Sequence, residues 1–453
     1  MKGLMYNSPT PAAAVSRRQF LKSSSLAAAA SATVVSFPAI LHAQSSQKIN
    51  AIIIGVGGRG SGAGKNFLDA AKVAGVDGKI VAVADIFPEQ AARAQNMYKR
   101  EYGLEVPADK CFSGFDGYQK ALAVPGVNYA IIATPPGFRP PYFKACVDAG
   151  KHVFTEKPVS VDGPGCRIMY AAGEEAKKKG LKIAAGTQRR HQASYIETIK
   201  RIKDGAIGDV TALRVYWVNG GPIWHRGDKG DTELEKQIRN WYHYIWLCGD
   251  HICEQHVHNL DIGNWVMGAH PVKAWGMGAR QMLDVDHKSG EIWDNFAVEY
   301  EYANGVRMHA YCGQVKRDWS SVSEAIVGSS GTANPGGSLQ TKDGQRWRFP
   351  RDQGVDPYMQ EHVDLINAIV KDTELNETKN VTDTTMTAIL GREAAYSGAA
   401  VEWDTVLNSK FTYGPDLLYK DASAMKWGPF RTLKSPLPNQ HDIFKSPPQV
   451  AGA

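Results

Sequence analysis

The sequence lacks the features that mark disulfide-stabilised, membrane-spanning and nucleic-acid-binding proteins. Beyond the N-terminal segment there is no run of about 18 apolar residues, so we expect no transmembrane span and no membrane association of the mature protein. The formal charge of +6 falls to +2 once residues 1–43, with four basic residues and no acid, are set aside. Nucleic acid is therefore not an expected partner. The six cysteines form no C-x-x-C pair, which argues against a disulfide framework: Cys111, Cys146, Cys166, Cys248, Cys253 and Cys312.

The N-terminal segment resembles a twin-arginine export signal. Arg17 and Arg18 precede a weakly apolar run rich in Ala, Ser and Val, and Leu41–Ala43 suits a signal peptidase. We expect residues 1–43 to be this signal and the mature protein to be periplasmic or secreted. A short membrane anchor is the alternative, but Pro38 and several serines interrupt the run. The resemblance implies export of a folded protein with its cofactor inside.

A buried strand near the start of the mature chain runs into a glycine-rich turn. Ala51–Ile54 is uninterrupted and apolar, and Gly55, Gly57 and Gly60 follow it in a G-x-G-x-x-G pattern. Such a turn exposes N–H groups at a helix N-terminus to phosphate groups. We predict that the turn, which includes Gly58 and Arg59, binds a dinucleotide. An incidental turn is the alternative in a chain with 45 glycines.

The next apolar strand, Lys79–Phe87, contains Asp85 near its end. In a Rossmann fold an acid at this position accepts hydrogen bonds from the adenosine ribose, and it would repel a 2′-phosphate. We therefore predict NAD as the cofactor. Arg59 would weaken this preference, which leaves NADP as an alternative, and an ordinary strand-end carboxylate is the alternative role for Asp85.

Strands and helices alternate through residues 48–188. Further strands are predicted at three segments: Asn128–Pro136, His152–Pro158 and Lys182–Gln188. The helices predicted between the strands include Pro88–Arg100, Tyr142–Gly150 and Asp162–Lys179. This alternation predicts a doubly wound parallel sheet with ligands at the carboxyl ends of its strands. Residues 44–187 are therefore predicted to form an NAD(P)-binding Rossmann domain.

Several motifs together resemble the Gfo/Idh/MocA oxidoreductase family, which includes glucose-fructose oxidoreductase and inositol dehydrogenase. Besides the glycine turn, they are Ala133-Thr134-Pro135, Glu156-Lys157-Pro158, His258 with Asp261, Gly328–Gly331, Gln360-Glu361-His362 and Gly391-Arg392-Glu393. The resemblance covers residues 48–405. It implies an α/β fold in which an α+β domain with a large open, mainly antiparallel sheet follows the Rossmann domain. It also implies cofactor contacts at Thr134, Pro135 and Glu156, and a carbohydrate substrate.

Residues 188–408 are predicted to form that substrate-binding domain. The expected elements are a helix at Ala193–Asp204 and strands at Val210–Val218, Val272–Met277, Asp294–Tyr302, Val306–Cys312 and Glu324–Val327. An open sheet face suits pairing with a second copy of the chain. Residues 409–453 are rich in Pro, Lys and Asp and are predicted to form an arm that lies on the body or on a neighbouring subunit.

Lys157 is the first candidate catalytic residue. Its position at a strand end before Pro158 places it at the lip of the expected cofactor cleft. An ammonium there can hydrogen-bond the reacting hydroxyl and stabilise a developing alkoxide. The resemblance assigns it the same role, and a solvated lysine is the alternative.

The segment Cys248–Asp261 is dense in residues that could do chemistry. On a regular helix Glu254, His258 and Asp261 would share one face, which suggests a histidine base tuned by a carboxylate. Relatives usually carry Asp where this chain has Glu254, and Gly where it has His256, which puts the hydrogen-bond geometry and the substrate in doubt. A zinc site is the alternative, but the spacing of the cysteines and histidines argues against it. We predict no metal.

Other candidates for contact with a substrate lie in two segments. Arg190 and His191 follow the strand Lys182–Gln188 directly, with surface salt bridges as the alternative. Trp241 and Tyr242 belong to the long insertion Asn219–Trp246, whose tryptophans could stack on sugar rings or simply cover the core.

The sequence thus favours an exported sugar or polyol oxidoreductase with tightly held NAD(H). One alternative is an NAD-dependent, redox-neutral glycosidase like those of family 109, which oxidise a sugar, eliminate the aglycone and reduce the sugar again. A binding module without catalysis is a third hypothesis. The presence of both Lys157 and His258 argues against it.

Overall fold

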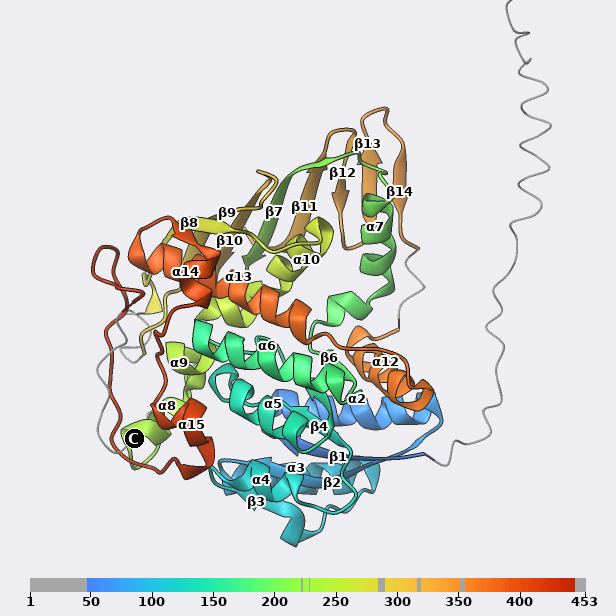
Figure 1. Ribbon diagram of the computed structural model, residues 1–453, viewed down its shortest axis with the longest axis vertical. Helices are drawn as coiled ribbons and strands as arrows, with labels where there is room; N and C mark the ends of the chain where they lie inside the picture. The colour runs from blue at the N-terminus through green and yellow to red at the C-terminus, as the bar shows by residue number, and fades with distance from the viewer. Residues whose placement is uncertain are drawn as a thin grey trace, which may run out of the picture. The chain divides into compact units, whose positions relative to one another are not determined.

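The computed structural model describes residues 47–220, 223–227, 229–283, 290–315, 319–350 and 355–444. The predicted export signal therefore lies outside the described residues. The chain forms two sheets with helices around them, and Figure 1 shows them at opposite ends of the view.

The first sheet has six parallel strands in the order β3-β2-β1-β4-β5-β6. Their bounds are β1 Lys48–Ile54, β2 Asp77–Asp85, β3 Cys111–Ser113, β4 Tyr129–Ile132, β5 His152–Thr155 and β6 Ile183–Ala185. The predicted doubly wound parallel sheet is confirmed. The short β3 had no apolar run by which the sequence could reveal it.

Helices cover both faces of this sheet. They are α2 Gly58–Ala74, α3 Pro88–Tyr102, α4 Gly117–Leu122, α5 Arg139–Asp148, α6 Gly163–Lys178 and α12 Pro357–Lys371. Alternate residues of β1 enter two different cores: Ile53 packs in the one that includes residues of α2, α3 and α12, and Ile52 in the one that includes residues of α5 and α6. Residues from near the C-terminus thus complete the core of the N-terminal sheet.

The second sheet has nine strands in the order β14-β13-β12-β11-β7-β10-β9-β8-β15. Their bounds are β7 Val210–Val218, β8 Lys273–Ala279, β9 Asn295–Glu301, β10 Arg307–Gly313, β11 Ser321–Gly328, β12 Gly331–Asn334, β13 Ser338–Thr341, β14 Arg346–Arg348 and β15 Val401–Glu402. Only the β7–β10 pair is parallel, so the predicted mainly antiparallel sheet is confirmed.

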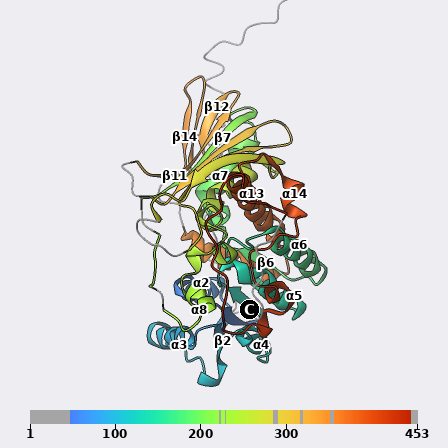
Figure 2. The same cartoon turned by 90° about the vertical axis from the view of Figure 1, so that its left-hand side faces the viewer.

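The helices of this part are α7 Ala193–Lys203, α8 Glu233–Arg239, α9 Ile245–Cys248, α10 Val257–Met267, α13 Thr378–Ser397, α14 Trp403–Leu407 and α15 Leu417–Asp421. Among them, α7, α10 and α13 pack on one face of the second sheet (Figures 1 and 2). Side chains alternate accordingly: Leu213 and Val215 are buried under these helices, whereas Arg214 points to the other face.

Short helical turns complete the described structure. They are η1 Ala108–Lys110, η2 Pro136–Phe138, η3 Gln188–His191, η4 Trp241–His243, the π-helical turn η5 Ile252–His256 and η6 Ala422–Ala424. No helix of the described residues is both long and apolar enough to cross a bilayer.

The described part of the C-terminal arm lies on the body of its own chain. Trp427 contacts Phe87 and Phe115 of the first domain. The backbone carbonyl of Pro436 accepts a hydrogen bond from Nε1 of Trp293, at 3.0 Å, in the second. The arm therefore contacts both domains.

Candidate functional site

The glycine turn joins β1 to α2 through a backbone that requires glycine at two positions. Gly55 has φ +87°, in the left-handed region, and a Cβ on Gly60 would lie 1.8 Å from the carbonyl oxygen of Gly55. A Cβ on Gly57 or Gly58 would meet no atom within 4 Å. The turn therefore leaves open space in front of the first N–H groups of α2, which fits a pyrophosphate.

Asp85 ends β2 beside this turn. Its Oδ2 accepts a hydrogen bond from the N–H of Val56 at 2.9 Å, and its Oδ1 accepts one from the N–H of Phe87 at 3.0 Å. Burial raises the pKa of Asp85, although both backbone hydrogen bonds oppose that rise. The carboxyl group is thus fixed at the edge of the turn, where the ribose of a dinucleotide would lie.

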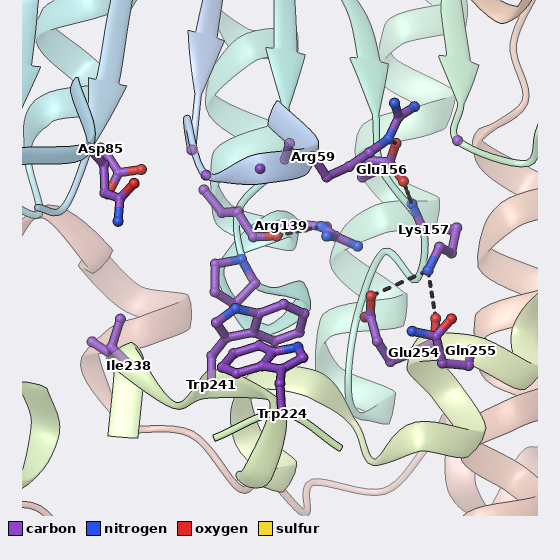
Figure 3. Close-up of a pocket in the computed structure, with 18 of the residues that line it drawn as sticks. Arg59, Asp85, Arg139, Glu156, Lys157, Trp224, Ile238, Trp241, Glu254 and Gln255 are labelled. Atoms are coloured by element: carbon purple, nitrogen blue, oxygen red, sulfur yellow. Dashed lines mark hydrogen bonds and ion pairs between the residues drawn. The ribbon is translucent and has the colours of Figure 1, made fainter. Parts of the chain in front are cut away.

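A cavity of about 1020 Å³ runs from Asp85 past the glycine turn to Lys157 (Figure 3). The first domain lines it with Gly55, Gly57, Gly58, Arg59, Asp85, Thr134, Pro135, Arg139, Glu156 and Lys157. The second lines it with Arg189, Trp217, Trp224, Ile238, Arg239, Trp241, Glu254, Gln255, His258 and Tyr358, among others. Its size suits a dinucleotide together with a small substrate. Gly60 lies outside the lining because it packs against Gly55.

Arg59 reaches away from Asp85, and Figure 3 places the two on opposite sides of the cavity. Its guanidinium is paired with Glu156 and lies 3.4 Å from Oε1 of Glu361. Burial alone would raise the pKa of Glu156, but Arg59, Lys157 and Arg139 together hold it below its ordinary value. Arg59 is therefore engaged by two carboxylates away from Asp85, and its expected effect on the preference between NAD and NADP stays a prediction.

Lys157 and Glu254 face each other at the other end of the cavity (Figure 3). The ammonium of Lys157 donates to the backbone carbonyl of Glu254 at 2.6 Å and lies 3.3 Å from its Oε1. Burial raises the pKa of Glu254, and Lys157 and Arg139 only partly offset this effect. Oε2 of Glu254 is buried and has no hydrogen-bond partner among the described residues.

The predicted single helical face for Glu254, His258 and Asp261 is wrong. A π-helical turn, η5, carries Glu254 and precedes α10, so the spacing of a regular helix does not hold. Glu254 and His258 line the cavity. Asp261 does not, because its carboxylate pairs with Arg190 at 2.8 Å and accepts a hydrogen bond from Thr384.

His258 presents a neutral imidazole to the cavity. Its ring lines the cavity and stacks on Trp217 at 5.8 Å between centroids. Burial lowers its pKa well below the ordinary value, and the charges of Lys157 and Arg189 lower it further. The group is therefore available to accept a proton.

The other predicted substrate residues divide between the cavity and its surroundings. Trp241 lines the cavity beside Trp224. Tyr242 is buried outside the lining, where its hydroxyl donates to Oε1 of Gln314 at 2.9 Å. His191 also lies outside it, 2.6 Å from Asp364 and 3.3 Å from Glu377; despite its burial, these carboxylates raise its pKa to about 10.

The sequence motifs did not indicate several residues that line the cavity. Arg189, next to the chosen Arg190, enters the cavity, and its guanidinium is held by Glu324 at 2.6 Å. Trp217 could have been found from the alternation along β7, because it shares the inward face of Leu213 and Val215. Among the described residues, no group of three or more His, Cys, Asp or Glu side chains could hold a metal ion, and all six cysteines are free.

Two family profiles match this chain. The one described as "Oxidoreductase family, NAD-binding Rossmann fold" matches residues 49–186, and that of the "GFO/IDH/MocA C-terminal domain" matches residues 195–334. Together they cover the glycine turn, Lys157, Glu254 and His258.

Several curated relatives are inositol dehydrogenases. The scyllo-inositol 2-dehydrogenase (NAD(+)) of Bacillus subtilis is 23% identical over 288 residues, which are 63% of this chain and 73% of that protein. The inositol 2-dehydrogenase of Rhizobium meliloti is 25% identical over 51% of this chain, and that of Pseudomonas savastanoi is 31% identical over 39%. These last two matches span 59% and 48% of the respective relatives.

Solved structures share the fold at lower identity. A levoglucosan dehydrogenase in complex with NADH and levoglucosan has a TM-score of 0.63 and 17% identity, covering 79% of this chain and 99% of the other. The scyllo-inositol dehydrogenase of Lactobacillus casei, with NAD(H) and scyllo-inositol, has a TM-score of 0.59 and 20% identity over the same shares. An aldose-aldose oxidoreductase of Caulobacter crescentus has a TM-score of 0.60 and 21% identity, covering 79% of this chain and all of the other.

Proposed function

Because this chain belongs to the Gfo/Idh/MocA family of NAD-binding oxidoreductases, we propose that it oxidises a hydroxyl group of a sugar or polyol with a tightly held NAD. One observation carries the proposal: Lys157 and His258 line the same cavity as the glycine turn. A carbohydrate between them would have its reacting carbon beside the nicotinamide end of a dinucleotide whose ribose lies at Asp85.

The residues present fit this cofactor. The open space at Gly57 and Gly58 would take the pyrophosphate, Asp85 the adenosine ribose, and Thr134, Pro135 and Glu156 would border the nicotinamide half. When bound, NAD supplies the acceptor for the hydride. Everything else that the reaction needs comes from side chains.

We propose that His258 is the base that removes the proton of the substrate hydroxyl, and that Lys157 stabilises the negative charge that develops on its oxygen. The neutral imidazole takes the proton of the substrate hydroxyl, and the ammonium donates a hydrogen bond to the oxygen that loses it. Glu254 holds the ammonium in place through its carbonyl and carboxyl oxygens. Trp217 keeps the imidazole oriented by stacking.

The test is to purify the full chain, release any bound small molecule, and identify it by absorbance and mass. We expect nicotinamide dinucleotide in near-equal amount to protein. Inositols, aldoses and anhydrosugars are then offered in turn, and the absorbance of reduced nicotinamide is followed. A protein that neither binds NAD nor reduces it with any member of this panel would contradict the proposal.

Redox-neutral glycoside cleavage is the second candidate. The observation that favours it is the buried carboxyl of Glu254, whose raised pKa and unpartnered Oε2 suit an acid that protonates a leaving group. Release of nitrophenol from a nitrophenyl glycoside, with no net change in nicotinamide, would select this candidate. Reduced nicotinamide that accumulates with a simple polyol would select the dehydrogenase.

We also propose export by the twin-arginine route, on the motif at Arg17 and Arg18. Replacing both arginines with lysine should keep the protein in the cytoplasm, as fractionation would show. We further propose that two copies of the chain pair through the open face of the second sheet, where Tyr216, Tyr311 and Met277 lie in one cross-strand row.

A further inference from the structure

The adenosine end of the cavity has a wall that does not come from the Rossmann domain. Ile238 and Arg239 of α8 line the cavity together with Asp85 and Phe87. Figure 3 shows Ile238 below Asp85, across the space from it. An adenosine placed at Asp85 would therefore lie between the two domains.

Arg239 connects this wall to the first domain. Its Nη1 lies 2.8 Å from Oε1 of Glu89, in the first turn of α3, and its guanidinium lies 3.9 Å from the centre of the Phe87 ring. Glu235, one turn earlier on α8, holds the same guanidinium at 2.9 Å. These contacts fasten α8 to the start of α3 and to Phe87, two residues after Asp85.

The C-terminal arm reinforces the same place. Trp427 stacks on the Phe87 ring, which also contacts Arg239, at 5.5 Å between centroids and 18° between planes. The arm is tied to α8 as well, because Nε2 of Gln237 donates to the carbonyl of Arg431 at 2.7 Å and the N–H of Leu234 donates to that of Gly428 at 3.3 Å. We call residues 233–239 and 427–431 the clasp.

We propose that the clasp retains the dinucleotide between turnovers by closing the adenosine end of the cavity. This inference rests on the proposed function. An adenosine can leave at this end only after the contacts of Arg239 with Glu89 and Phe87, or the stack of Trp427 on Phe87, have opened. A retained cofactor must be reoxidised where it is bound, so in the dehydrogenase reaction a second carbonyl compound must enter the same cavity and accept the hydride.

The test measures the release of NADH from the full chain. NADH is loaded, an excess of NAD⁺ is mixed in, and the loss of bound-NADH fluorescence gives the release rate. Arg239→Ala should raise this rate roughly fivefold, since it removes the ion pair with Glu89 and the cation–π contact with Phe87 that join α8 to the first domain, as well as the ion pair with Glu235 within α8. Glu89→Gln removes only the ion pair and should have a smaller effect, and Trp427→Ala should raise the rate about tenfold.

Arg201→Ala is the matched control. Arg201 also has a carboxylate partner, Glu197 at 2.8 Å, and lies 4.4 Å from an aromatic ring centre, that of Trp347, but it does not line the cavity. Its release rate should equal that of the wild type. Thermal melting of each variant shows that the fold is intact, and Glu89→Gln, on the surface, keeps the test open if Arg239→Ala fails to fold.

The outcomes separate this inference from the proposed function. If NADH binds and the clasp variants release it at the wild-type rate, the clasp is refuted and the dehydrogenase proposal stands. If NADH does not bind the wild type at all, both fail. Faster release from Arg239→Ala and Trp427→Ala, with an unchanged Arg201→Ala, supports retention by the clasp.

Discussion

At the scale of single residues, the chemistry depends on how Lys157 distributes its three donors. Two of them face the carbonyl and carboxyl oxygens of Glu254. The third remains for a substrate oxygen in the cavity. Glu254 thus positions the ammonium and leaves one of its donors free for the substrate.

Removing this ammonium should separate binding from turnover. Lys157→Ala is expected to keep NADH binding within about threefold and to lower kcat by about 10²–10³, the usual effect of deleting a group that stabilises a developing oxyanion. Fluorescence titration and steady-state kinetics measure the two effects. Lys144→Ala, on the surface of α5 and paired with Asp148, is the control. Wild-type turnover by Lys157→Ala would remove this residue from the mechanism.

The neutral state of His258 gives a prediction on pH. Because burial and nearby cations lower its pKa, the imidazole stays unprotonated at pH values where an ordinary histidine, with a pKa of about 6.5, would be charged. The profile of kcat/KM for oxidation should therefore stay flat as the pH falls through 6.5 and decline only below it. An acid limb at or above 6.5 would contradict this assignment. His258→Gln should lower kcat by about 10²–10⁴.

Most catalytic candidates could be read from motifs, but the neighbours that tune them could not. Lys157, Glu254 and His258 were accessible because strand ends and short motifs are local in sequence. Arg139 and Trp217 reach the same cavity from elsewhere in the chain, and their roles depend on tertiary packing. The sequence alone does not distinguish Arg190 from its neighbour Arg189. Only the folded structure shows that Arg190 pairs with Asp261, whereas Arg189 pairs with Glu324 and lines the cavity.

At the scale of elements, the glycine turn fixes where α2 begins. This constraint can be tested by replacing either of two glycines of α2, Gly60 or Gly62, with alanine. Gly60→Ala would place a Cβ 1.8 Å from the backbone oxygen of Gly55, so the turn must open. We expect a loss of NADH binding and a fall in stability of about 2–4 kcal/mol, as for overpacking against backbone. Calorimetry and fluorescence titration measure both.

Gly62→Ala is the control for this prediction. It lies two residues further along α2, and its Cβ would approach only the end of the Arg59 side chain, at 3.9 Å. Alanine favours a helix over glycine by about 1 kcal/mol, so this variant should be at least as stable as the wild type. Equal behaviour of the two variants would show that the turn does not constrain α2.

Elements were predictable where a regular pattern ran long enough. The strands β1, β2, β4, β7 and β9 each have a continuous or alternating apolar run. The strands β3 and β12–β15 have two to four residues each and, unlike the equally short β4, none is an uninterrupted apolar run of four residues. The π-helical turn η5 escaped because periodicity arguments assume a regular helix, and this turn is what separates Asp261 from Glu254 and His258.

At the scale of the whole molecule, the open face of the second sheet is the surface that the described fold leaves without cover. One cross-strand row on it runs through Tyr216, Tyr311, Ala297 and Met277. Tyr216 stacks on Tyr311 at 5.7 Å, and Met277 is 62% exposed. A contiguous apolar row of this kind typically marks a protein–protein contact.

Two copies related by a two-fold axis could pair through this row, because such an interface uses the same patch on both subunits. We expect a dimer in solution, and Tyr311→Glu, which places a carboxylate in the middle of the row, should weaken it by at least tenfold. Val73→Glu is the control, since it also places a carboxylate at an exposed apolar position, but on α2 and not on the second sheet; Val73 is 60% exposed. Sedimentation over a range of concentrations measures both dissociation constants.

Dimer formation through the open face would also affect the candidate active site. Tyr216 and Trp217 are neighbours along β7 and point to opposite faces of the sheet, and His258 stacks on Trp217. A dimer that forms through the open face, where Tyr216 and Tyr311 lie, would therefore stiffen the strand that carries Trp217. Dissociation by Tyr311→Glu should then raise KM for the substrate while NADH release, controlled at the other end of the cavity, stays unchanged. A wild-type monomer at all concentrations would rule out the pairing, and a dimer that survives Tyr311→Glu would place the contact elsewhere.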